Sequence, residues 1–503
     1  MRPGTGTWPG NSDDRVNAGL AITAVTVVSL ATAIIGFYGL RVSRTTGDFY
    51  VASRTVRPWW NASAIGGEYL SAASFLGVAG LILLSGTDAL WFPVGYTAGY
   101  LMLLLFVAAP LRRSGAYTIP DFTESRLSSR TVRRVTSLVV VMVGWLYIVP
   151  QLHGAALTIH IATGLPSWVG SVAVVVVVCL TVVAGGMRSI TFVQAFQYWL
   201  KLTALAVPIL FIIFVLAGQG TEPQSLPAAN PTGVPPAGLY QNVSLLVALL
   251  FGTLGLPHVL VRFYTNPDGQ SARRTTLIVL GLLSVFYLFP TAYGLVARMF
   301  APGLARSGQP DAMVLRLPGE LVGGVPGDLL SALVVAGAFA AFLSTTSGLV
   351  VSLAGVISQD VLGGGVRGFR LAAVVSAVVP LGFAFMTGSL ALAGSVGLVF
   401  AFTASTVCPV LLLGIWWRGL TDAGAIAGMV TGGMLCGGAM IAGAVSGSDL
   451  APAWLAQPAA WSVPTAFAVM VTVSKATAHR IPATMPRIMT RLHTPERPLA
   501  TER

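Results

Sequence analysis

Residues 64–74 read AIGGEYLSAAS, and they lie inside an apolar run that is long enough to cross a membrane. Two adjacent glycines, an acid and two serines at membrane depth are typical of an interrupted helix, although small residues also serve close helix packing. A second stretch, FGTLGLPH at 251–258, combines glycine with proline five apolar runs further along. Unwound backbone exposes carbonyl oxygens that bind cations and helix ends that attract carboxylates. These matching breaks predict a transporter with its binding site where the two breaks meet.

The composition excludes a water-soluble globule. Of the 503 residues, 55% are hydrophobic and 9% are charged, whereas a soluble domain carries about 25% charged residues. The net charge of +12 does not indicate nucleic-acid binding, because the basic residues form no long stripe interleaved with aromatics. They lie mostly in short loops between apolar runs, which is how membrane orientation is encoded. We therefore expect an all-α polytopic protein of the cell (plasma or inner) membrane.

Thirteen stretches are candidates for membrane spans, each of which needs about 20 residues. They cover residues 17–41, 60–84, 89–110, 135–161, 166–185, 190–218, 239–262, 274–299, 327–358, 370–388, 389–415, 421–444 and 457–475. With the N-terminus outside, 23 of the 29 Lys and Arg residues fall on the inner side and 5 on the outer side, while Lys201 lies within a span. This distribution predicts an outside N-terminus and a cytoplasmic C-terminus.

The domain organisation follows from these spans. We expect an extracytoplasmic N-terminus over residues 1–16, a transmembrane domain over 17–475 and a cytoplasmic tail over 476–503 that is disordered. The 28 residues after the last span are too few for the signalling domain that a membrane sensor would need. A channel would need a pore ring or filter loop, which we do not find in the sequence.

A cation site is predicted within the span 327–358. Ala341, Ser344 and Thr345 stand at positions i, i+3 and i+4, so they share one face of a helix. One carbonyl and two hydroxyls directed at one point suit a hard monovalent cation, which prefers oxygen ligands. Ser and Thr hydroxyls also bond back to their own helix, and that alternative stays open.

The remaining polar residues at membrane depth indicate no enzyme chemistry. Lys201 could pair with a substrate carboxylate, extend along its own helix, or pair with another group inside the protein. His153 and His258 have no second ligand at metal spacing, so we expect them to be core or helix-end residues. We find no pairing of nucleophile and base, and we expect neither an enzyme nor a cofactor other than a coupling ion.

The chain resembles the sodium:solute symporter family from Gly47-Asp48-Phe49-Tyr50 to the last span, and Gly185–Gln194 is similar to the family's signature stretch. More specific runs resemble its acetate and monocarboxylate branch: Glu68–Gly77, Gly255–His258, Arg262–Thr265 and Ser344–Asp360. The resemblance implies an inverted repeat of five plus five helices of the leucine-transporter type, with one leading and two trailing helices. Repeat one would cover about 60–218 and repeat two about 239–415.

The family's shared sodium site would map onto five residues of this chain: the carbonyls of Gly67, Leu70 and Ala341 and the hydroxyls of Ser344 and Thr345. Some relatives carry an acid or amide one turn from this point, where this chain has Tyr69, and its Glu68 comes one position earlier. We therefore do not assign to Glu68 the role that this acid has in those relatives.

The function implied by the resemblance is symport of a cation, expected to be Na+, with a short-chain monocarboxylate such as acetate, propionate or pyruvate. The candidates for substrate binding are Glu68, Tyr69, Ser71, Lys201, Gly255 and His258. The expected partners are a small carboxylate, Na+ or H+, and the lipid bilayer. Proton coupling, another small solute such as an amino acid or sugar, and a transporter-like sensor remain alternatives.

Overall fold

The computed structural model describes residues 17–42, 52, 56–220, 238–387, 391–446 and 452–495, and within these ranges every regular element is a helix. The N-terminus 1–16 and the Gly47–Tyr50 run lie outside the described residues. The long helices are α1 (Ala18–Val42), α8 (Arg130–Thr163), α9 (Trp168–Gln219), α12 (Gly269–Phe300), α14 (Gly324–Asp360), α15 (Gly365–Met386), α16 (Leu392–Trp416), α17 (Asp422–Ser446) and α19 (Ala459–Ala476). The shorter helices are α3 (Pro58–Tyr69), α4 (Val78–Ser85), α5 (Trp91–Phe106), α6 (Ala108–Arg113), α7 (Ile119–Leu127), α10 (Leu239–Gly255), α11 (Pro257–Phe263), α13 (Met313–Val322), α18 (Ala453–Ala456) and α20 (Met485–His493).

The apolar helices agree with the expected membrane protein. In the described ranges nine helices are long and apolar enough to cross a membrane, or ten if the bent pair α10 and α11 forms one span. The described residues of all thirteen predicted spans lie largely on helices, and α9 covers two of those spans with a break at Gly186, where φ is 56°. The number of spans therefore stays a prediction, while the helical class is confirmed.

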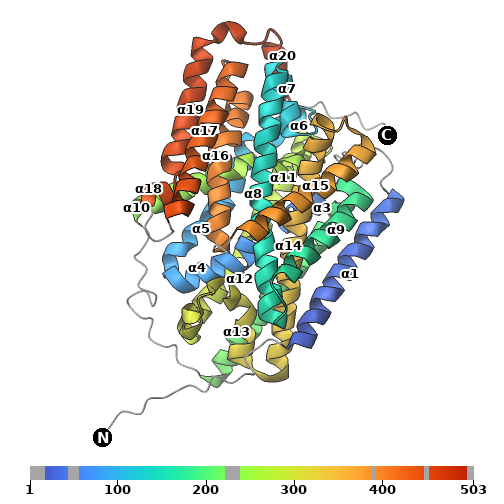
Figure 1. Ribbon diagram of the computed structural model, residues 1–503, viewed down its shortest axis with the longest axis vertical. Helices are drawn as coiled ribbons and strands as arrows, with labels where there is room; N and C mark the ends of the chain where they lie inside the picture. Colours follow the sequence, from blue (N-terminus) through green and yellow to red (C-terminus); the bar gives the residue numbers. More distant parts are fainter. Residues whose placement is uncertain are drawn as a thin grey trace.

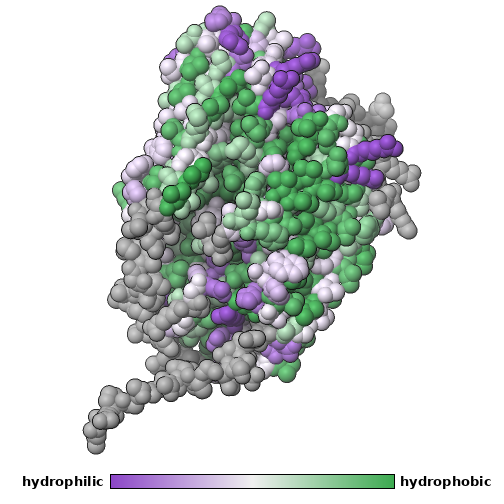
Figure 2. Space-filling model, viewed as in Figure 1, coloured by the Kyte–Doolittle hydropathy of each residue, from purple (hydrophilic) through white to green (hydrophobic). Residues whose placement is uncertain are grey.

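The outer surface is suited to lipid. Figure 2 shows a broad hydrophobic area on the drawn face, with hydrophilic side chains at its upper end and a second group of them lower down. Large apolar side chains on the outer helices are exposed, among them Phe214 of α9, Leu288 of α12 and Met434 of α17. In water this exposure would be costly, but in a bilayer the same side chains face hydrocarbon.

The centre of the bundle is α14, which packs against α9, α8, α15 and α1 (Figure 1). Small side chains allow this close packing. At Gly337 an added Cβ would lie 2.3 Å from the Cβ of Ala204 on α9. The last residue of α14 is anchored by an ion pair, since Arg133 of α8 lies 2.6 Å from Asp360. These contacts fix the position of α14 along its axis relative to its neighbours.

Two expectations about the inner side are corrected. The tail is not wholly disordered, because Met485–His493 forms the amphipathic helix α20, which buries Met489 and Leu492 against the bundle. Arg126 and Arg262, which we counted as loop charges, are buried. The guanidinium of Arg126 donates to carbonyls at the end of α16. It therefore stabilises the end of a helix and is not an exposed loop charge.

Candidate functional site

The first break lies where the sequence predicts it. Helix α3 ends at Tyr69, and Leu70 leaves helical geometry with φ −75° and ψ 85°. A π-helical turn, Ala73–Gly77, then leads into α4. The amide of Ala72 donates to Oε1 of Gln151 on α8 at 2.9 Å, which holds the unwound segment in place. The segment therefore presents backbone groups to the centre of the bundle.

The second break separates α10 from α11. Leu256 is extended, with φ −67° and ψ 115°, and Pro257 begins the next helix, as its fixed φ and missing amide favour. The two helices meet at an angle of 46°. Helix α11 packs against both α3 and α14, so the two breaks and the central helix lie together.

The five groups predicted to bind the cation gather between α3 and α14, and we call them the cation cage: the carbonyls of Gly67, Leu70 and Ala341 and the hydroxyls of Ser344 and Thr345. The hydroxyl of Ser344 donates to the carbonyl of Gly67 across the helix interface. The hydroxyl of Thr345 donates to the carbonyl of Glu68 at 2.7 Å. All five cage residues are buried, and an added Cβ on Gly67 would lie 2.2 Å from the carbonyl oxygen of Gln194. That close backbone approach explains why a glycine is required at 67.

Lys201 places its ammonium in the cation cage. Its Nζ donates to the carbonyl of Gly67, to the carbonyl of Leu70 at 2.8 Å and to the hydroxyl of Ser344 at 3.0 Å. An ammonium has three donors and no acceptor, so all three of its hydrogens are used here. In the structure this lysine is paired inside the protein, with cage oxygens, which is one of the roles that the sequence left open. The cage therefore accommodates a positive charge.

A buried ion pair lies directly beside the cage. Nε of Arg262 on α11 is 2.8 Å from Oε2 of Glu68 on α3, and both side chains are at most 1% exposed. The other guanidinium nitrogens donate to the hydroxyl of Thr191 at 2.7 Å and to Oε1 of Gln194, both on α9. Since a buried charge is costly unless it is paired and hydrogen-bonded, this network ties α3, α9 and α11 into one unit.

Thr191 and Gln194 belong to this network, and the sequence analysis did not single them out as site residues. Besides accepting from Arg262, Gln194 donates through Nε2 to the carbonyl of Ser344 at 2.8 Å. It thereby joins the ion pair to the cation cage. Both residues stand in the signature stretch Gly185–Gln194, but their local spacing gave no sign of these roles.

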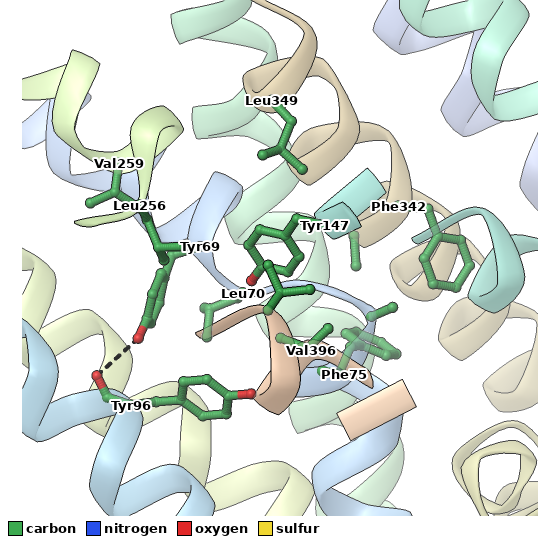
Figure 3. Packing of buried hydrophobic residues seen from close by; sticks show 14 of the residues in the cluster. Tyr69, Leu70, Phe75, Tyr96, Tyr147, Leu256, Val259, Phe342, Leu349 and Val396 are labelled. Carbon is green, nitrogen blue, oxygen red and sulfur yellow. Dashed lines mark hydrogen bonds between the residues drawn. The ribbon is translucent and has the colours of Figure 1, made fainter. Parts of the chain in front are cut away.

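Aromatic and hydroxyl side chains surround the breaks on the other side. The hydroxyl of Tyr69 lies 3.1 Å from the carbonyl of Tyr96 and 3.1 Å from the hydroxyl of Thr253 on α10. Figure 3 shows Tyr69 pointing toward Tyr96, with Tyr147 near the unwound Leu70. The rings of Tyr147 and His258 are 5.2 Å apart. The candidate residues from both breaks thus meet at this aromatic cluster.

Several polar atoms in this region are buried without a partner among the described residues. They include both ring nitrogens of His258, the hydroxyl of Thr346, the hydroxyls of Tyr96 and Tyr100, and Oε1 of Glu68. Buried polar groups are normally hydrogen-bonded, so these atoms distinguish this region from the rest of the packed interior. Gly255 has a different setting, because a Cβ there would lie 2.8 Å from Thr403 on α16. Its geometry is that of a helix-packing contact.

Comparison with known proteins identifies the family. The model of the Sodium:solute symporter family matches residues 49–432. The chain belongs to the sodium:solute symporter family. A symporter relative from Bacillus subtilis (strain 168), named "Uncharacterized symporter YwcA", is 33% identical over 423 residues, which cover 80% of this chain and 82% of the relative.

Solved structures show which fold this symporter has. A Na+-coupled sialic acid symporter in a substrate-bound, outward-open state superposes with a TM-score of 0.71 at 15% identity, covering 91% of this chain and 98% of that one. Mhp1, a nucleobase-cation-symport-1 transporter in a closed conformation, gives a TM-score of 0.56 at 14% identity, with 88% and 98% covered. Both have the leucine-transporter fold, so this predicted fold class is confirmed. The family and the neighbours are transporters and not enzymes.

Proposed function

We propose that this symporter takes up short-chain monocarboxylates, such as acetate, propionate or pyruvate, with Na+ as the coupling ion. The observation that carries the cation half is the cage itself, where oxygens of α3 and α14 surround an ammonium. Oxygen donors of this kind suit Na+ as well. Support for the substrate half comes from the runs that resemble the monocarboxylate branch, including Arg262–Thr265.

The substrate would bind between the two breaks, where polar atoms are buried without partners. Both ring nitrogens of His258 and the hydroxyl of Thr346 have no hydrogen-bond partner among the described residues. A carboxylate supplies acceptors and no donors, so it matches a donor nitrogen of His258 and the hydroxyl of Thr346. The methyl or ethyl group would then contact the aromatic cluster of Tyr69 and Tyr147.

Transport would follow from differential binding of the ligands to two states. In this proposal Na+ in the cage stabilises one arrangement of the repeats 60–218 and 239–415, and the substrate then binds beside it. A ligand shifts such an equilibrium only by as much as its affinity differs between the states. The cation gradient supplies the work of uptake.

The substrate class is tested by uptake into proteoliposomes. We expect labelled acetate, propionate and pyruvate to accumulate under an inward Na+ gradient and to compete with one another. An imposed proton gradient without Na+ serves as the matched control for the coupling ion. Uptake that is blocked by a sugar or an amino acid and indifferent to acetate and pyruvate would refute the monocarboxylate assignment.

The proposed orientation is tested by labelling single cysteines in a background without the three native cysteines. The prediction is that Thr494→Cys reacts with an impermeant maleimide only in permeabilised cells, because the tail is cytoplasmic. Gly303→Cys is the control on the opposite side, at an exposed residue with nothing within 4 Å of an added Cβ. Labelling of position 494 in intact cells would contradict the proposed orientation and place the tail outside.

A further inference from the structure

Lys201 is an unexpected occupant of a site that is suited to a free cation. Its side chain is fully buried, and its ammonium contacts three of the five groups of the cation cage. A second unit charge placed in the same cage would stand within a few ångströms of the ammonium. At low dielectric this repulsion is strong, so the two cations exclude each other.

We propose that Lys201 is a tethered competitor of the transported cation. Its ammonium holds the cation cage while Na+ is absent, and Na+ binds only when the ammonium leaves. This inference rests on the proposed coupling to Na+, and it goes further by naming the residue that sets the affinity for the ion. It requires no change of protonation, only a change in the position of a flexible side chain.

The structure also offers a place for the displaced ammonium. Oε2 of Glu68 is paired with Arg262 at 2.8 Å, whereas Oε1 is buried with no partner among the described residues. The carboxylate of Glu68 lies against α14, since a Cβ on Gly348 would be 2.2 Å from Oε1. Gly348 is one helical turn beyond Ser344, a step of about 5–6 Å between neighbouring side chains. The long side chain of Lys201 can cover such a step by rotation about its own bonds.

Charge balance then links the ion to the substrate. Three buried charged side chains gather here, namely Glu68, Lys201 and Arg262, with a net charge of one positive unit. Entry of Na+ adds a second positive unit to a region with little water. A bound carboxylate restores the original net charge, so each ligand lowers the electrostatic cost of binding the other. Under this scheme Na+ and a monocarboxylate bind together better than either does alone.

The test measures Na+ binding by the purified full-length protein without substrate. Thermal stabilisation in detergent is recorded against Na+ concentration, with choline replacing Na+ at constant ionic strength, and 22Na+ binding is measured in parallel. We expect Lys201→Ala and Lys201→Gln to lower the half-saturating Na+ concentration by at least about tenfold, because the competitor's charge-assisted hydrogen bonds are gone. Lys475→Ala, which removes an exposed lysine at the end of α19, is the matched control and should change nothing.

A second variant tests the destination of the ammonium. Glu68→Gln removes the charge that receives Lys201, so the half-saturating Na+ concentration should rise by about threefold or more. In the double variant Lys201→Ala/Glu68→Gln this rise should shrink, because the effects of interacting residues are not additive. The Glu68 result remains decisive even if a lysine variant does not fold, as judged by size-exclusion chromatography.

Three results would overturn the proposal. Folded Lys201 variants with unchanged or weaker Na+ binding would make the lysine a structural tie between α9 and the cage. Unchanged Na+ binding in Glu68→Gln would show that the ammonium of Lys201 does not move to Glu68 when Na+ binds. A raised KM for the monocarboxylate in Lys201→Gln, with Na+ binding unaltered, would return Lys201 to the substrate-binding role expected from the sequence. Because no substrate is present in the binding assay, a failure of monocarboxylate uptake leaves this test intact.

Discussion

An Arg262→Gln protein should lose most of its uptake and about 3–5 kcal/mol of stability, the usual consequence of removing one partner of a buried ion pair. Glu68 would remain buried with its charge uncompensated, and Thr191 and Gln194 would each lose a charged donor. The measurement is equilibrium unfolding in mixed detergent micelles, together with initial rates of uptake in proteoliposomes.

The control is the same substitution in an exposed ion pair. Arg480 is paired with Asp422 at 2.6 Å, but its side chain is 50% exposed, so Arg480→Gln should leave the stability nearly unchanged. Part of the lost stability should return in Glu68→Gln/Arg262→Gln, since no unpaired charge is then left in the interior. If the single Arg262 variant is as stable and as active as Arg480→Gln, the pair has no structural role.

Replacing Ser344 with Ala should raise the Na+ concentration for half-maximal uptake by about tenfold or more. A hydrogen bond or ligand to a charged group contributes roughly 1.5–3 kcal/mol, and the substitution changes volume and helix propensity little. The ammonium of Lys201 would keep its bonds to the carbonyls of Gly67 and Leu70, whereas Na+ would lose one of few oxygen ligands. The loss therefore falls mainly on the ion.

Thr345 supplies the matched series for this prediction. Thr345→Ala should weaken Na+ dependence, although the hydroxyl donates to the carbonyl of Glu68 here and must turn to meet an ion. Thr345→Ser keeps the hydroxyl and should be much milder. If both Thr345 variants and Ser344→Ala show wild-type dependence on Na+, these hydroxyls serve only the packing of α3 on α14.

Much of the fold could be predicted from local composition. Apolar runs of sufficient length specify helices because a bilayer leaves no other partner for backbone groups. The stretches 64–74 and 251–258 located both breaks, although the first break falls at Leu70 and leaves Gly66 and Gly67 inside α3. The boundary between the predicted spans 166–185 and 190–218 likewise coincides with the break at Gly186. The amphipathic helix α20 was not predicted, because it is stabilised by contacts with the bundle rather than by its own mixed composition.

The sequence by itself determined that Ala341, Ser344 and Thr345 share one face of α14, because their spacing is a local property of one helix. What occupies that cage was decided only by the tertiary structure. Lys201 is more than 130 residues from Gly67, and Arg262 is 194 residues from Glu68. No periodicity encodes such pairings, since they arise when α9 and α11 pack beside α3 and bury their charges together. In the low dielectric of the interior, a buried charge is costly unless it is paired or hydrogen-bonded. The ammonium of Lys201, the carboxylate of Glu68 and the guanidinium of Arg262 therefore lie together in one site.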